Sequence, residues 1–148
     1  MCKHKKRYEE IYCRYKKYTI DEVRKLWEWS KSEYEKMGKY PVIFIDGDKK
    51  IKTSMGKKTS SNYRYDNFFL HGTDCVSCGL KGQYFWLEKN NDNRTKTWHF
   101  NLYGVDENGR EVQMTKDHII PKSCGGKNHV DNYQPMCCRC NLAKGNKQ

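Results

Sequence analysis

The sequence contains little apolar material. Hydrophobic residues make up 36% of its 148 positions, below the usual ~45–50% of globular domains, and alanine occurs only once, at Ala143. No stretch approaches the ~20 consecutive apolar residues of a membrane-spanning helix, so we expect no membrane partner. A core as small as this one often needs a staple such as a disulfide or a bound metal ion.

The start of the sequence also lacks the apolar segment of a secretory signal, because residues 1–7 are charged and no apolar run follows them. We therefore expect a cytoplasmic protein, in a reducing compartment where paired cysteines are interpreted first as metal ligands. Lysine, asparagine and tyrosine have codons rich in A and T, and they occur 22, 11 and 11 times. This usage favours an AT-rich genome such as that of a phage, which would place the protein in a bacterial host.

Positive charge is in excess, with 29 Lys and Arg against 18 Asp and Glu and a net charge of +11. The charge favours a polyanionic partner, first of all DNA, although a merely soluble basic surface explains it equally well. Residues 1–66 hold 18 basic and 10 acidic side chains, whereas residues 67–148 hold 11 and 8. The long-range attraction for DNA is therefore expected mainly from the N-terminal half. The candidate phosphate-binding residues near the start of this half are Lys3, Lys5, Lys6 and Arg7.

Two regions are predicted, with a boundary near residue 66. Residues 1–66 are expected to form a basic accessory region with a helical segment. Its first 18 residues, rich in tyrosine, are predicted to be partly helical or ordered only on binding. Residues 67–148 contain the motifs that carry chemistry, and they are expected to form the catalytic domain.

A helix over residues 19–37 is the clearest local prediction. Thr19 and Glu22 have the spacing of a capping box, and Gly38 favours a C-terminal stop. A short buried strand is expected over residues 41–45, where five apolar or proline residues follow one another.

Two CxxC pairs stand out among the eight cysteines: Cys75 with Cys78, and Cys137 with Cys140. Four sulfur ligands satisfy tetrahedral zinc and leave no open position, which is typical of a structural site. Such a site would connect two parts of the chain that are far apart in the sequence. Cys138 could replace Cys137, although its spacing to Cys140 would then be CxC.

The other cysteines carry weaker signals. Cys2, His4 and Cys13 could form part of a second metal site, but a fourth ligand is not obvious and free thiols are favoured. Cys124 lies in a glycine-rich loop and is interpreted as a bystander.

A group of polar residues between and after these pairs can carry chemistry. Asp117 and His118 are adjacent at a predicted strand end, where alternation sends neighbours to opposite sides. Asp117 and Asn141 offer oxygen ligands for a hard cation, and His118 can take a proton from water. Asn132 offers an amide that could orient the imidazole, and Lys144 could meet a phosphate. Each residue alone has an ordinary explanation, such as a surface pair, a turn or a helix cap.

Taken together, the stretch resembles the HNH nuclease family, which has the ββα-metal fold. The motifs are DHIIPxSxGG beginning at Asp117, NxQ at Asn132, and CxxCNxxKGN beginning at Cys137, preceded by CxxCG at Cys75. The resemblance covers about residues 75–147. It implies an α+β fold, in which a ββα-metal (HNH) catalytic module is stapled by a four-cysteine zinc site.

The same resemblance implies the roles of the residues. His118 would be the general base, oriented by Asn132, while Asp117 and Asn141 would hold a catalytic Mg²⁺ or Mn²⁺ ion. The two CxxC pairs would hold structural zinc. The implied protein is a metal-dependent DNA endonuclease that nicks as a monomer. A double-strand break would need two copies, as in a homodimer, or two successive nicks. The alternative is a non-catalytic zinc module that binds nucleic acid.

The sequence departs from the family pattern in two places. The last motif residue is Asn141 rather than histidine, and an oxygen ligand at this position favours Mg²⁺ or Mn²⁺ over softer metals. Residues 79–116 are longer than the compact family minimum and predict a β-hairpin over residues 98–114 with an Asn-Gly turn. Within this insertion His99 is expected to be structural. The aromatic residues 84–86 are expected to lie in the core rather than to stack on bases.

Overall fold

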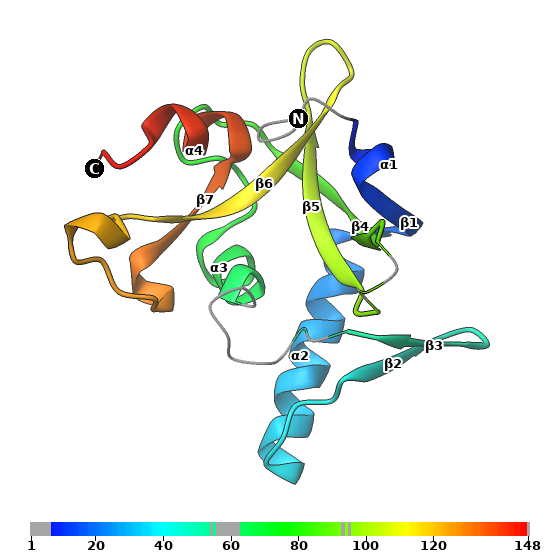
Figure 1. Cartoon of the computed structure of the whole chain (residues 1–148). Helices are drawn as coiled ribbons and strands as arrows, with labels where there is room; N and C mark the ends of the chain where they lie inside the picture. The colour runs from blue at the N-terminus through cyan, green and yellow to red at the C-terminus, as the bar shows by residue number, and fades with distance from the viewer. Residues whose placement is uncertain (1–6, 54, 56–62, 93, 95, 148) are drawn as a thin grey trace.

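The computed structural model describes residues 7–53, 55, 63–92, 94 and 96–147 (Figure 1). In the described part of the chain, a five-stranded antiparallel sheet has the strand order β1-β4-β5-β6-β7, and a separate hairpin pairs β2 with β3. The predicted α+β class is confirmed. The elements are α1 (Tyr8–Ile11), β1 (Tyr12–Thr19), α2 (Ile20–Met37), β2 (Ile43–Asp46), β3 (Lys49–Lys52), α3 (Tyr63–His71), β4 (Gly82–Asn90), β5 (His99–Val105), β6 (Glu111–His118), η1 (Lys122–Cys124), η2 (Val130–Asn132), β7 (Tyr133–Cys137) and α4 (Cys138–Lys144).

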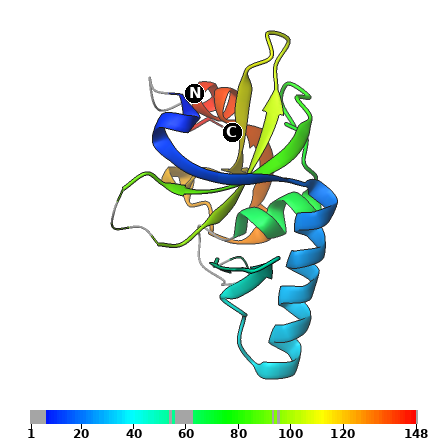
Figure 2. The ribbon, with the colours of Figure 1, turned by 90° about the vertical axis from the view of Figure 1, so that its right-hand side faces the viewer.

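The main sheet has one apolar face. Alternation along β4, β5 and β6 directs apolar side chains to this face, where α2 and α3 cover it (Figures 1 and 2). Fully or nearly fully buried side chains of this core include Phe85, Leu87, Phe100, Leu102 and Val112 from the strands and Val23 and Phe68 from the helices. The core thus unites elements from both halves of the chain. None of the described helices is long and apolar enough to cross a membrane.

Helix α2 agrees with the sequence prediction for residues 19–37. Thr19 is its N-cap, and the reciprocal bonds between Thr19 and Glu22 complete the capping box. The helix ends at Gly38, whose φ of 72° lies in the left-handed region that glycine adopts without strain. Trp27 anchors α2 to α3, because its indole N–H donates to the Asp66 carboxylate at 2.8 Å.

Of the first 18 residues, which were predicted to be partly helical or ordered only on binding, the structure describes residues 7–18, and these are mostly a strand. Helix α1 covers only four residues, and β1 then runs antiparallel to β4, with Tyr12 opposite Asn90 and Thr19 opposite Tyr84. Strand pairing decides this conformation, since β4 supplies partners for β1 on both sides of an irregularity at Tyr15. The boundary predicted near residue 66 falls inside α3, and the sheet contains strands from both sides of it.

The predicted phosphate-binding residues of the N-terminus are placed only in part. Lys3, Lys5 and Lys6 lie outside the described residues, as do Cys2 and His4. Arg7 immediately precedes α1, and its guanidinium forms an exposed ion pair with Glu10 at 3.5 Å.

The strand predicted over residues 41–45 forms as β2 over Ile43–Asp46, but the prediction that it is buried is wrong. Phe44 is 6% exposed, whereas Ile43 and Ile45 are 51% and 68% exposed. Strand β2 pairs with β3 in a two-stranded hairpin, so only one of its faces meets the core.

The predicted hairpin of residues 98–114 is present as β5 and β6. Gly109 of its Asn-Gly turn has a φ of 76°, and the Asp106 carboxylate accepts backbone N–H bonds from Asn108 and Arg110 at 2.9 Å. Beyond this hairpin, β6 continues and pairs with β7 from Met114 to His118. Strand β6 therefore leads directly from the insertion to the predicted reaction centre.

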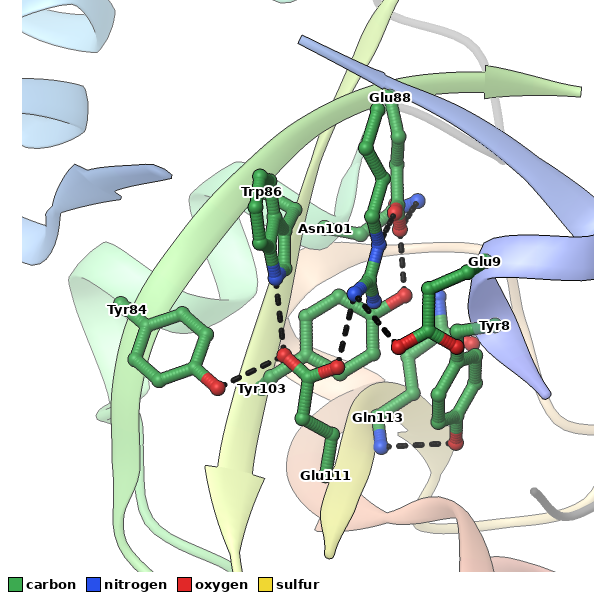
Figure 3. A network of polar contacts seen from close by, with 10 residues as sticks. Tyr8, Glu9, Tyr84, Trp86, Glu88, Asn101, Tyr103, Glu111 and Gln113 are labelled. Atoms are coloured by element: carbon green, nitrogen blue, oxygen red, sulfur yellow. Dashed lines mark hydrogen bonds and ion pairs between the residues drawn. The ribbon is translucent and has the colours of Figure 1, made fainter. Parts of the chain in front are cut away.

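A polar network covers the other face of the sheet and connects β1 to it (Figure 3). The guanidinium of Arg14 donates to Glu88 at 2.9 Å and to Glu111 at 2.8 Å. Glu88 is fully buried, and its carboxylate also accepts from the Asn101 amide at 2.8 Å and from the Tyr103 hydroxyl. Burial raises the pKa of Glu88 although these donors work in the opposite direction.

The aromatic residues 84–86 divide between the two faces of β4. Phe85 lies in the apolar core, as predicted. The Tyr84 hydroxyl and the Trp86 indole N–H both donate to Glu111, at 2.7 and 2.8 Å, so these two rings belong to the network (Figure 3).

Candidate active site

The C-terminal end of β6 separates the two adjacent residues Asp117 and His118 as alternation predicts. Asp117 is 5% exposed, and its carboxylate contacts Lys144 of α4. His118 points to the opposite side, where its ring packs edge-on against Tyr133 of β7 with centroids 4.9 Å apart. The end of β6 thus places a buried carboxylate and an imidazole on opposite sides of the strand, at consecutive residues.

The carboxylate of Asp117 is fixed by two donors. Its Oδ2 accepts from the Gln134 amide at 2.9 Å and from the Lys144 ammonium at 2.6 Å. The same ammonium donates to the backbone carbonyl of His118 at 2.6 Å. Lys144 was predicted to bind phosphate. Its ammonium is ion-paired with Asp117, the predicted metal ligand, and the phosphate contact stays a prediction.

The imidazole of His118 is held by Asn128. Its Nε2 lies 2.8 Å from the Asn128 Oδ1. Because an amide oxygen only accepts, Nε2 donates in this contact, and the neutral form of the ring then carries its lone pair on Nδ1. The sequence did not single out Asn128, since it lies in a polar loop and nothing in its spacing distinguishes it from other asparagines.

Asn132 braces the loop that follows β6 rather than the imidazole. Its Oδ1 accepts from Ile120 N–H at 2.9 Å, and its Nδ2 donates to the carbonyls of Ile120 and Lys127 at 3.1 and 2.9 Å. The side chain that contacts the imidazole is therefore Asn128, and the role of Asn132 in orienting His118 stays a prediction. Both ends of the Asn132 amide are engaged with the backbone of this loop.

The second glycine of the motif, Gly126, is required for a steric reason. A Cβ on Gly126 would lie 1.7 Å from the carbonyl oxygen of Ile120. The loop therefore requires glycine at this point to fold back on the end of β6, which is where Asn132 and Asn128 reach the site.

Asn141 of α4 completes the predicted group. Its Nδ2 donates to the Thr115 hydroxyl at 2.8 Å, and that hydroxyl donates to the Met136 carbonyl at 2.7 Å. These bonds fix the amide and use its nitrogen, so that Oδ1 remains the side-chain oxygen for another ligand. A pocket of about 240 Å³ brings Asn141, Asp117 and His118 together.

The donor set of this pocket fits a hard divalent cation. A carboxylate and an amide oxygen are ligands that Mg²⁺ and Mn²⁺ accept, and solvent or phosphate oxygens usually complete their coordination. Both Asp117 and Asn141 line the pocket and are held by neighbouring side chains. The residues present could therefore hold such an ion.

Lys116 also lines the pocket, and the sequence did not identify it. Its ammonium lies 4.4 Å from the centroid of the Tyr133 ring. Burial, together with the positive charges of Arg64 and Lys122, lowers the pKa of Lys116 to about 8.

The two CxxC pairs meet in space as predicted. The sulfur atoms of Cys75, Cys78, Cys137 and Cys140 all lie within 4.8 Å of one another, and those of Cys78 and Cys137 are 3.9 Å apart. With Zn–S bonds of about 2.3 Å, a tetrahedral site separates its sulfurs by roughly 3.8 Å. The cluster could therefore hold zinc with little adjustment.

Backbone groups of the two knuckles point at sulfur. Cys78 N–H donates to the Cys75 sulfur at 3.5 Å, and Cys140 N–H donates to the Cys137 sulfur at 3.4 Å. Burial opposes ionisation of Cys75, yet backbone N–H donors outweigh it and lower its pKa to about 7. The cluster uses Cys137 rather than Cys138, whose sulfur lies 3.8 Å from the Tyr8 hydroxyl. Cys13 and Cys124 are exposed and lie outside the cluster.

Comparison with known families matches residues 104–147 to the model of the HNH endonuclease family. The matched segment includes the whole of β6, β7 and α4 and hence the residues Asp117, His118, Asn132 and Asn141, while Cys75 and Cys78 precede it. No curated protein and no solved structure matches the chain significantly. The chain thus carries, over residues 104–147, a domain of the HNH endonuclease family, which indicates a nuclease or a related function on nucleic acid.

Proposed function

We propose that this protein is a metal-dependent endonuclease that hydrolyses phosphodiester bonds of DNA and nicks one strand per monomer. The observation that carries the proposal is the geometry at the end of β6. Asp117 and His118 reach one pocket from opposite sides of the strand, and Asn128 fixes the imidazole.

His118 acts as the general base in this proposal. With Nε2 donating to Asn128, the lone pair on Nδ1 takes a proton from a water molecule. The resulting hydroxide attacks the phosphorus in line, the bond to the opposite oxygen breaks, and that oxygen takes a proton from solvent. Asn128 and the loop braced by Asn132 are positioning groups, because they set the ring's direction without touching the substrate.

Asp117 and Asn141 would hold the catalytic cation, Mg²⁺ or Mn²⁺. When bound there, the ion would stabilise negative charge that develops on the phosphate. Lys144 occupies one oxygen of Asp117, so that the carboxylate is already desolvated and oriented by α4.

The four-cysteine cluster would hold structural zinc in a cytoplasmic protein. It connects the turn before β4 to the end of β7 and the start of α4. Since α4 supplies Asn141 and Lys144, the zinc would hold one wall of the pocket in place.

A plasmid-nicking assay with added Mg²⁺ tests the chemistry. We expect wild-type protein to convert supercoiled plasmid to the open circle, and His118→Ala to lower the rate at least ~100-fold, the lower range for loss of a general base. Glu35→Ala is the control, because Glu35 is exposed on α2 and is not among the residues that line the pocket. Equal rates for wild type and His118→Ala would disprove the assigned base.

The alternative function predicts a different outcome in the same assay. A non-catalytic zinc module would retard plasmid in a gel and yet leave it supercoiled at every Mg²⁺ and Mn²⁺ concentration. The joint presence of Asp117, His118 and Asn141 at one pocket favours the nuclease, because binding alone does not require these three groups together.

A further inference from the structure

A second polar side chain accompanies His118 on β6. Lys116 lies two positions earlier, so alternation places both side chains on one face of the strand and Asp117 on the other. Both rest on Tyr133: the ammonium lies 4.4 Å from the ring centroid, and the imidazole packs against the ring with centroids 4.9 Å apart. Lys116 and His118 therefore form one wall of the pocket of about 240 Å³.

The charge of this wall differs from that of the opposite wall. Lys122 lines the same pocket, so that two lysine side chains border it beside His118. Around Asp117, by contrast, the charge is balanced, because the Lys144 ammonium lies 2.6 Å from the carboxylate. Positive charges that gather in a partly desolvated place attract an anion strongly.

The spacing along β6 indicates which anion fits. Two residues of an extended strand span about 7 Å. This is comparable with the distance between neighbouring phosphates of a nucleic-acid strand, so a phosphate that reacts beside His118 brings its neighbour close to Lys116.

On the basis of the proposed function, we infer that Lys116, assisted by Lys122, binds the phosphate next to the reacting one on the cleaved strand. Lys116 is thus a positioning residue that sets the register of the strand relative to His118. A lysine is suited to this task because its ammonium is a compact charge on a flexible stem.

Neutral phosphate analogues test the contact directly. Once the nick is mapped, single methylphosphonates are placed at each phosphate near it in a synthetic duplex. We expect Lys116→Met to lower kcat/KM about ten- to a hundredfold on the normal duplex, the range for one charge-assisted hydrogen bond. The penalty should fall toward onefold when one flanking phosphate is neutral, and Lys116→Arg should restore most of the activity. A penalty that is equal on every duplex would assign Lys116 a structural role and overturn the inference.

Salt dependence gives a second readout without cleavage. In a His118→Ala background, loss of one phosphate contact should lower the slope of log K against log salt by about 0.9 for duplex DNA. Lys25→Met is the matched control, since Lys25 is an exposed residue of α2 that pairs with Asp21. A wild type that nicks no DNA would refute the proposed function, whereas an unchanged slope in Lys116→Met would refute the Lys116 contact.

Discussion

Two buried carboxylates of this molecule, Glu88 and Asp117, each pair with a cation, but their surroundings differ. Glu88 is fully buried and accepts from Arg14, Asn101 and Tyr103. The Arg14 guanidinium is itself enclosed, with the Trp86 ring centroid 4.6 Å away. Asp117 is almost as buried, at 5% exposure, yet it borders a pocket with room for a substrate group.

Strand β6 connects these two environments, because Glu111 at its start belongs to the network and Asp117 near its end belongs to the site. Alternation places both side chains on the same face. A buried ion pair is therefore not by itself a sign of function. What distinguishes the Asp117 end is adjacent space, together with a histidine and an amide oxygen that reach the same space.

Removal of zinc from the four-cysteine cluster should have the largest effect on stability and activity, and it should disturb the region around Asp117. Structural zinc contributes apparent binding free energies of about 10–16 kcal/mol in small domains, so we expect a chelator to abolish nicking and unfold the C-terminal part. Metal content and circular dichroism measure this. Well-folded protein that contains no zinc as isolated would contradict the proposed staple.

Glu88→Gln should weaken the polar network around Arg14 and lower the free energy of unfolding. Three donors point at the two oxygens of Glu88, and an amide presents one oxygen and a competing N–H₂ group to them. Damage to a buried ion pair costs about 3–5 kcal/mol, which urea unfolding would detect. Glu107→Gln, in the exposed turn between β5 and β6, is the control. A Glu88→Gln protein as stable as wild type would show that the network does not anchor β1.

Stability is also expected to depend on pH through His99, which lies opposite Glu88 in the pairing of β4 with β5. Burial, with a smaller effect of Arg64, lowers the pKa of His99 from 6.5 to about 4. Below pH 6.5, His99 binds a proton in the unfolded chain but stays neutral in the folded protein. The free energy of unfolding is therefore undiminished by His99 above pH 6.5 and decreases as the pH falls toward 4.

The expected loss is up to about 3 kcal/mol between these limits, from 1.36 kcal/mol for each pKa unit. Urea unfolding of wild type and His99→Gln at pH 7 and pH 4.5 measures it, and the difference between the two proteins removes the effect of other titrating groups. A parallel decline of wild type and His99→Gln would contradict the burial effect.

Local features of the sequence predicted much of this molecule. The capping box at Thr19, the hairpin with its Asn-Gly turn, and the opposite directions of Asp117 and His118 depend on backbone geometry over a few residues. The cysteine cluster was also predictable, because tetrahedral coordination demands four sulfur ligands wherever the chain runs. In each case the determining interaction is either short-range or imposed by the ligand.

Other features were decided by tertiary structure. The pairing of β1 with β4 and the enclosure of Arg14 by Glu88 and Glu111 join residues that are at least 65 positions apart. No local pattern specifies such contacts, since their formation depends on which surfaces the whole chain leaves to be covered. The same holds for Lys116 on the wall of the pocket.

By itself the sequence determined which chemical groups are present and which neighbours lie on opposite sides of a strand. The contacts of Asn128 with the imidazole and of Lys144 with Asp117 arise from the folded chain. Hydrogen bonds and ion pairs extend over only a few ångströms, and several asparagines and lysines of the sequence have the same chemical ability. The path of the loop after β6 places Asn128 beside His118, and the packing of α4 against β6 places Lys144 beside Asp117.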